Sequence, residues 1–182
     1  MKIFFKTVIT ILVLTLISCN EDEVNEPTPV NKFTVAGVDY VTTNCYVEFD
    51  EDTTPDEFNL FFLNSLMYDN DGGSGDYSFS ETTFNWVFYN IRDDENPSIM
   101  TPYPNIQTGI PYIGGSSDTV IIANGTPEDE DSGTNFSSNG TPTITINSWN
   151  FDMTANTGTI NVDYVWGQVT GHYEGTVGII LD

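Results

Sequence analysis

An acidic segment in the first half of the chain has residue types that suit a hard cation. Residues 69–76 read Asp-Asn-Asp-Gly-Gly-Ser-Gly-Asp, so Asp69, Asp71 and Asp76 are spaced by small residues. Ca²⁺ takes about 6 to 8 oxygen ligands, and a tight Gly-rich loop can turn carboxylates toward one ion. The match to an EF-hand loop fails because Ser80 stands where the twelfth position requires Glu. Two interpretations stay open: a calcium site, or a flexible hairpin loop between two strands.

Residues suited to acid–base or nucleophilic catalysis are sparse. His172 is the single histidine, with Glu174 on the same face if the segment is a strand. No Ser stands in a nucleophile elbow, which a hydrolytic relay through His172 requires. Glycoside hydrolysis needs two carboxyls held about 5 to 10 Å apart, whereas the acids cluster in segments that suit solvated loops. We expect no enzyme and no catalytic residues, with a hydrolase that uses unidentified acids as an alternative.

Three aromatic residues are the ones most expected to be exposed. Tyr103 lies between two prolines, Tyr112 follows Pro111, and Trp149 lies where the strand pattern changes parity. Exposed rings of this kind can stack on sugars, which makes these three the candidate ligand-binding residues. The other interpretation is that they anchor rigid loops.

The elements that must position these residues are β-strands. Apolar segments are short, rich in β-branched and aromatic residues, and bounded by Gly, Pro, Asn or Asp. The clearest is 169–181, where alternate residues are apolar, so that Tyr173 faces inward and His172 outward. Gly167-Gln168 predicts a tight turn that joins this strand to 159–166.

Further strands complete a predicted all-β domain. Between 144–146 and 149–153 the inward parity switches, which predicts a β-bulge near Asn147-Ser148. Earlier strand candidates are 33–42, 45–49, 58–66, 77–80, 84–91, 107–113 and 119–123. About ten strands favour an antiparallel β-sandwich or a closed barrel.

The N-terminal residues have the pattern of a secretory signal. Lys2 and Lys6 precede an apolar run that is shorter than the roughly 18 residues needed to cross a bilayer. The run ends in Leu16-Ile17-Ser18-Cys19, which resembles a bacterial lipobox. This resemblance implies a lipoprotein signal peptide over 1–18 and a lipidated Cys19. Charged residues and prolines without apolar periodicity predict a flexible acidic tether over 19–32. The length that remains suits a single domain over 33–182. With Cys19 acylated, Cys45 has no disulfide partner.

The net charge of the chain argues against a nucleic-acid partner. The chain has 27 acids and only four Lys and Arg, for a formal net charge of −23. Nucleic-acid binding needs clustered cations to replace counterions, so we expect no nucleic-acid partner. Attachment to a membrane would instead depend on acyl chains at Cys19.

Three motifs carry a family resemblance: FTVAGVDY at 33–40, NWVFY at 85–89 and VTGHYEGTV at 169–177. Together they resemble small β-sandwich lipoproteins of unknown function from Flavobacteria and other Bacteroidetes. The acidic residues at 20–23 are similar to the export signal of such lipoproteins, although a solvated tether explains them equally well. The resemblance implies an outer-membrane lipoprotein that faces the exterior and acts as a non-catalytic binding or structural module. The alternative is a carbohydrate-binding accessory of an outer-membrane uptake system, with a glycan or an outer-membrane protein as its partner.

Overall fold

The computed structural model describes residues 31–49, 57–70, 77–92, 95–96, 106–115, 119–126, 132–137 and 140–181. These residues form strands and their connections and contain no helix, so the predicted all-β class is confirmed. In this part of the chain there is thus no helix with the length and apolar character to span a membrane. The predicted signal peptide and tether lie outside the described residues.

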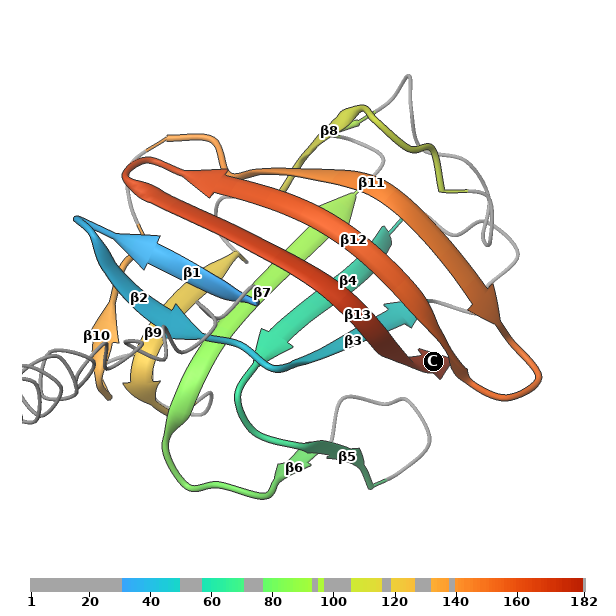
Figure 1. Cartoon of the computed structure of the whole chain (residues 1–182), viewed down its shortest axis with the longest axis horizontal. Helices are drawn as coiled ribbons and strands as arrows, with labels where there is room; N and C mark the ends of the chain where they lie inside the picture. Colours follow the sequence, from blue (N-terminus) through green and yellow to red (C-terminus); the bar gives the residue numbers. More distant parts are fainter. Residues whose placement is uncertain are drawn as a thin grey trace, which may run out of the picture.

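Eleven strands form one large sheet and two more form a small hairpin (Figure 1). The large sheet runs in the order β10-β9-β7-β4-β3-β13-β12-β11-β8, with β1 paired to β13 and β2 paired to β1. Its strands are β1 (Lys32–Val35), β2 (Val38–Val41), β3 (Asn44–Phe49), β4 (Glu57–Leu63), β7 (Phe84–Arg92), β8 (Pro111–Ile113), β9 (Val120–Gly125), β10 (Thr134–Asn135), β11 (Thr143–Asp152), β12 (Thr157–Trp166) and β13 (Val169–Leu181). The hairpin consists of β5 (Met67–Asp69) and β6 (Tyr77–Phe79).

The large sheet curls into a half-barrel and does not divide clearly into the two stacked layers of a sandwich (Figure 1). Tyr89 of β7 lies edge-on to Tyr164 of β12, with ring centroids 5.6 Å apart. Three strands separate β7 from β12 in the sheet, so these two rings meet across the inside of the curl. The main core therefore fills the concave face.

The far end of the sheet returns toward β7. A single antiparallel bridge joins Ile91 to Gly114, and the Gly115 amide donates to the carbonyl of Asn90 over 2.9 Å. The buried Asn96 side chain donates to the carbonyl of Ile113 and accepts from the amide of the same residue. These contacts hold β8 beside β7 although the sheet order places them far apart.

Strand β13 occupies the middle of the sheet and has three partners. Along one edge its first half pairs antiparallel with β1, and its last residues pair parallel with β3, from Val177 opposite Cys45 to Leu181 opposite Phe49. Its other edge pairs with β12. The sheet is thus not antiparallel throughout, which corrects the antiparallel prediction at this one pair.

A tight turn divides the segment 33–42, which the sequence pattern presented as one strand. Ala36 and Gly37 have φ of 50° and 83°, and they connect β1 to β2 as a two-residue hairpin. A hairpin turn of this length needs positive φ at both central residues. Ala is an uncommon residue there, which is why the sequence does not show the turn.

Two predicted details of the C-terminal strands are confirmed. The pairing of β11 with β12 shifts register between Ile146 and Ser148, so Asn147 is the extra residue of a bulge. The β12–β13 hairpin turns at Gly167-Gln168, with Trp166 directly opposite Val169. Tyr173 is buried and His172 faces outward, as the alternation predicts.

A second, smaller core covers part of the convex face. Strand β4 sends Phe58, Leu60 and Phe62 to the main core and Phe61 and Leu63 to the opposite side. The β5–β6 hairpin packs over that opposite side through Met67, Tyr77 and Phe79. Part of the sheet around β4 and β7 is therefore buried on both faces, whereas His172 on β13 stays accessible on its outer face.

Candidate functional site

The outer face of the sheet places three charged side chains in one row. Register puts Lys32 of β1 and Asp163 of β12 on either side of His172 of β13. Directly opposite residues on one face of a sheet have Cβ atoms about 4.5 to 5.5 Å apart, close enough for their side chains to interact. Rigid strands, not loops, position these groups.

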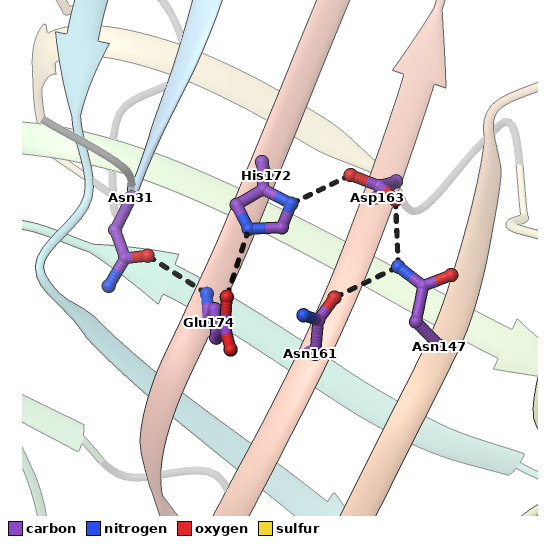
Figure 2. Close-up of polar contacts among 6 residues, drawn as sticks. All are labelled: Asn31, Asn147, Asn161, Asp163, His172 and Glu174. Atoms are coloured by element: carbon purple, nitrogen blue, oxygen red, sulfur yellow. Dashed lines mark hydrogen bonds and ion pairs between the residues drawn. The ribbon is translucent and has the colours of Figure 1, made fainter. Parts of the chain in front are cut away.

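His172 and Asp163 form the central pair (Figure 2). The imidazole Nδ1 lies 2.7 Å from Asp163 Oδ1, so Nδ1–H donates to the carboxylate. The second oxygen, Oδ2, accepts a 2.7 Å hydrogen bond from Asn147 Nδ2. That amide also donates to Asn161 Oδ1 over 2.9 Å.

The β-bulge in β11 makes this arrangement possible. Asn147 is the residue without a partner in the β11–β12 register, so its side chain is directed differently from those of a regular strand. It reaches two outward residues of the neighbouring strand, Asn161 and Asp163. The bulge therefore fixes the carboxylate that in turn fixes the imidazole.

The other nitrogen of His172 faces a second carboxylate (Figure 2). Nε2 lies 4.0 Å from Glu174 Oε2, beyond a hydrogen bond. Asn31 holds the backbone here, since its Oδ1 accepts from the Glu174 amide over 2.9 Å. The side chains of His172, Asp163 and Glu174 are 31%, 58% and 65% exposed, so solutes reach all three.

Lys32 is held by its own hairpin. Its Nζ lies 2.6 Å from Asp39 Oδ2, and Thr34 Oγ1 donates to Asp39 Oδ1 over 2.7 Å. These hydrogen bonds, from Lys32 first and Thr34 second, lower the pKa of the Asp39 carboxyl. Both oxygens of Asp39 are thereby engaged, and Lys32 keeps two further N–H donors.

Two opposing effects act on the pKa of Asp163. Partial burial alone would raise it, but the hydrogen bonds from His172 and Asn147 and the charge of His172 together lower it. The carboxylate is therefore stabilised in its ionised form, in which it accepts hydrogen bonds from several sides.

A shallow pocket of about 250 Å³ lies beside these groups. Its lining consists of Lys32, Thr34, Asp163, Thr170, Gly171 and His172. Gly171 contributes only backbone between Thr170 and His172, since a side chain there would point to the core side, toward Tyr164. The pocket thus offers ammonium, hydroxyl and imidazole donors together with carboxylate and hydroxyl acceptors.

Of the three predicted calcium ligands, only Asp69 lies within the described residues. Asp69 ends β5 and pairs with Tyr77 at the start of β6, so the two strands form a hairpin, as one of the two open interpretations expects. Asp71 and Asp76 lie outside the described residues. Within the described ranges, no three His, Cys, Asp or Glu side chains are grouped so as to hold a metal ion by themselves.

Two of the three predicted aromatic ligand-binding residues, Tyr112 and Trp149, lie in the described part of the chain, and both pack against the core. Tyr112 is only 1% exposed, and its hydroxyl is hydrogen-bonded to the backbone of Gln107, so the prediction of an exposed ring is wrong. Tyr112 lies on the short strand β8, within the predicted strand 107–113, and its ring faces Phe58 on the inner side. Trp149 is half-buried against the core and donates Nε1–H to the carbonyl of Ile106 over 2.8 Å. Tyr103 lies outside the described residues.

The two cysteines are Cys19 and Cys45, and only Cys45 lies within the described residues. Cys19, the predicted lipidation site, lies outside the described residues. Cys45 is a free, buried thiol whose pKa is raised by desolvation, as expected for a small core residue. Its inward position on β3 agrees with its alternation with Val47 and Phe49.

Sequence reasoning selected His172 and Glu174 as a pair but missed Asp163, Asn147 and Lys32. A signal for Asp163 was present, because a two-residue turn at Gly167-Gln168 fixes the register of the hairpin. Counting back from Trp166 and forward from Val169 places Asp163 opposite His172. No comparable signal marks Lys32, since its strand meets β13 across most of the chain length.

Comparison with known proteins identifies no relative of this chain. The chain matches no family model, no curated protein and no solved structure. The geometry of the outer face is therefore the basis on which function is argued.

Proposed function

We propose that this chain is a lipid-anchored, non-catalytic binding module whose ligand site is the outer-face pocket beside His172. The observation that carries the proposal is the way its polar groups are held. Asp163 is fixed by His172 and Asn147, and Lys32 is fixed by Asp39, each through hydrogen bonds of 2.6 to 2.7 Å. Side chains that are fixed before binding lose little conformational entropy when a ligand arrives.

Charge in the pocket favours a neutral ligand. The two nitrogen donors already face carboxylates: the Lys32 ammonium faces Asp39, and the His172 imidazole donates to Asp163. An anion in the pocket would be repelled by these carboxylates. A cation would find only the carboxylate of Asp163 in the lining, and both oxygens of that group already accept hydrogen bonds. A molecule rich in hydroxyl groups can both donate to Asp163 and accept from Lys32.

This pattern supports a carbohydrate as the ligand class. Sugar hydroxyls need donors and acceptors close together, and Lys32, Thr34 and Asp163 provide both kinds within one pocket lining. A carbohydrate-binding accessory of an outer-membrane uptake system is therefore the more specific form of the proposal. In this proposal the ligand binds on the outer face of the sheet and not at the predicted aromatic residues.

The proposed anchor places this site near a membrane. Strand β1 begins at Lys32, and Cys19 precedes it by 13 positions. A fully extended segment of that length spans at most about 45 Å. An outer-membrane lipoprotein facing the exterior would thus present the pocket close to the lipid surface.

The anchor is tested by Cys19→Ser. Metabolic labelling with palmitate should be lost and uncleaved precursor should accumulate, because the acylated thiol is absent. Labelling that is unaffected by the substitution would overturn the lipoprotein assignment.

The ligand site is tested by screening the purified chain on a glycan array and measuring the affinity of any glycan found. Lys32→Met and Asp163→Asn should each weaken binding at least tenfold, whereas Glu81→Gln, an exposed charge change outside the pocket, should not. Binding that is unchanged in both pocket variants would place the site elsewhere. Turnover of a chromogenic glycoside or ester that Asp163→Asn abolishes would favour the hydrolase alternative.

A further inference from the structure

His172 has one ring nitrogen fixed and the other directed at a carboxylate, which is how proteins prepare a histidine for a metal ion. Nδ1–H donates to Asp163, so in the neutral imidazole Nε2 carries the free lone pair (Figure 2). Metal-binding histidines commonly donate their second N–H to a carboxylate, which fixes the tautomer and raises the basicity of the ligand nitrogen.

The distance between Nε2 and Glu174 fits a shared ion. Bond lengths of about 2.0 to 2.2 Å to nitrogen and oxygen give a largest bridged separation of about 4.2 Å. The observed separation of Nε2 and Oε2 is 4.0 Å. Glu174 is mostly exposed, so its side chain can move closer and bend the angle at the ion.

We propose that His172 Nε2 and the Glu174 carboxylate bind a divalent first-row transition-metal ion, with Zn²⁺ as the probe. Imidazole and carboxylate together suit Zn²⁺ and its neighbours better than Ca²⁺ or Mg²⁺, which prefer oxygen alone. With two protein ligands, water completes the coordination shell.

The metal position differs from the glycan pocket of the proposed function. Glu174 follows His172 along β13, whereas the pocket lies over Thr170 and Gly171 before it. The nearest cation, Lys32, is tied to Asp39 and does not compete for Glu174. His172 and Asp163 belong to both positions, since both line the pocket and Asp163 also orients the imidazole.

The test uses the chain purified without a histidine tag, because its single histidine makes every imidazole signal that of His172. Long-range ¹H–¹⁵N NMR should show the Nδ1–H tautomer before Zn²⁺ is added and a shift of the Nε2 resonance afterwards. In calorimetric titration, His172→Gln and Glu174→Gln should each weaken the strongest Zn²⁺ site at least tenfold. Asp163→Asn should weaken it about 10- to 100-fold through loss of imidazole orientation.

Glu81→Gln is the matched control, since it removes one exposed carboxylate elsewhere and should leave Zn²⁺ affinity unchanged. An unshifted Nε2 resonance at saturating Zn²⁺, or equal affinities for His172→Gln and the unaltered chain, would overturn the proposal and assign Zn²⁺ to other acids. Because no glycan is present, a failed glycan screen leaves this result intact. A failed Zn²⁺ titration likewise leaves the glycan site to its own test.

Discussion

Tyr173 and His172 are neighbours on β13 whose side chains have opposite environments. Tyr173 is 2% exposed, packs on Phe62 and donates its hydroxyl to the carbonyl of Thr176 over 2.5 Å. Tyr173→Ala should lower the free energy of unfolding by about 3 to 5 kcal/mol, because it leaves a cavity in the core. His172→Ala should cost less than about 1 kcal/mol, the usual range for an exposed ion pair. Urea titration of both variants checks this, and equal midpoint shifts would contradict the assignment of faces.

Asp163 should contribute to stability in a pH-dependent way. Its pKa is lowered in the folded chain, so the ionised carboxylate stabilises folding above the unfolded pKa of about 3.9. That contribution is lost as pH falls through the lowered folded pKa. The melting temperature of the unaltered chain should therefore exceed that of Asp163→Asn at pH 5 to 7, and the difference should shrink below about pH 3.5. A difference that persists unchanged at pH 2.5 would show that the carboxylate charge is not its source.

At the scale of elements, glycines in β13 make room for aromatic rings from neighbouring positions. A methyl group on Gly171 would overlap the ring of Tyr164, its direct partner on β12. That ring is buried and stacked on Phe62 at 5.1 Å, so it has no free space to enter. Gly171→Ala should therefore destabilise the chain by about 1 to 3 kcal/mol.

Gly175→Ala provides a control on the same strand and the same face. Its added methyl would come no closer than 3.2 Å to any atom, and that atom is the Tyr173 hydroxyl. The cost should be clearly smaller than for Gly171→Ala in the same thermal melts. Similar costs at both positions would mean that strand propensity, and not the Tyr164 ring, explains the effect.

The elements that the sequence predicted best are those joined by local signals. Alternation placed Tyr173 inward, the parity change located the bulge at Asn147, and Gly167-Gln168 located a hairpin turn. Elements that depend on distant pairing were not predictable in this way. The parallel contact of β3 with β13 links residues about 130 positions apart, and alternation within a strand carries no information about its partner.

The candidate site shows the same division. The faces of His172 and Glu174 follow from period-two alternation, whereas the position of Lys32 follows only from the β1–β13 register. The error at Tyr112 has a physical reason, since the residues of the predicted strand 107–113 do not show which of its faces is covered, and Tyr112 lies on the covered face.

At the scale of the whole molecule, charge repulsion should make stability depend on salt. With 27 acids and four Lys and Arg, the chain should melt at a higher temperature as NaCl is added, because salt screens repulsion. A specific calcium site would add to this. At ten times its dissociation constant, Ca²⁺ contributes about 1.4 kcal/mol.

The calcium contribution is isolated by comparing Ca²⁺ with Mg²⁺ at equal ionic strength. A gain specific to Ca²⁺ that disappears in Asp69→Asn/Asp71→Asn would assign it to the β5–β6 connection. An undiminished gain in that double variant would leave screening as the explanation. Differential scanning calorimetry is the measurement.

The central place of β13 has a consequence for the order in which the domain assembles. This strand joins a block of β3, β4, β7, β9 and β10 to a block of β12, β11 and β8, and it also receives β1. Neither block can complete its edge until residues near position 180 are available, so the domain remains unfinished while those residues are still being synthesised. Such late, long-range closure is slow. We therefore expect the domain to fold slowly compared with proteins whose contacts are mostly local.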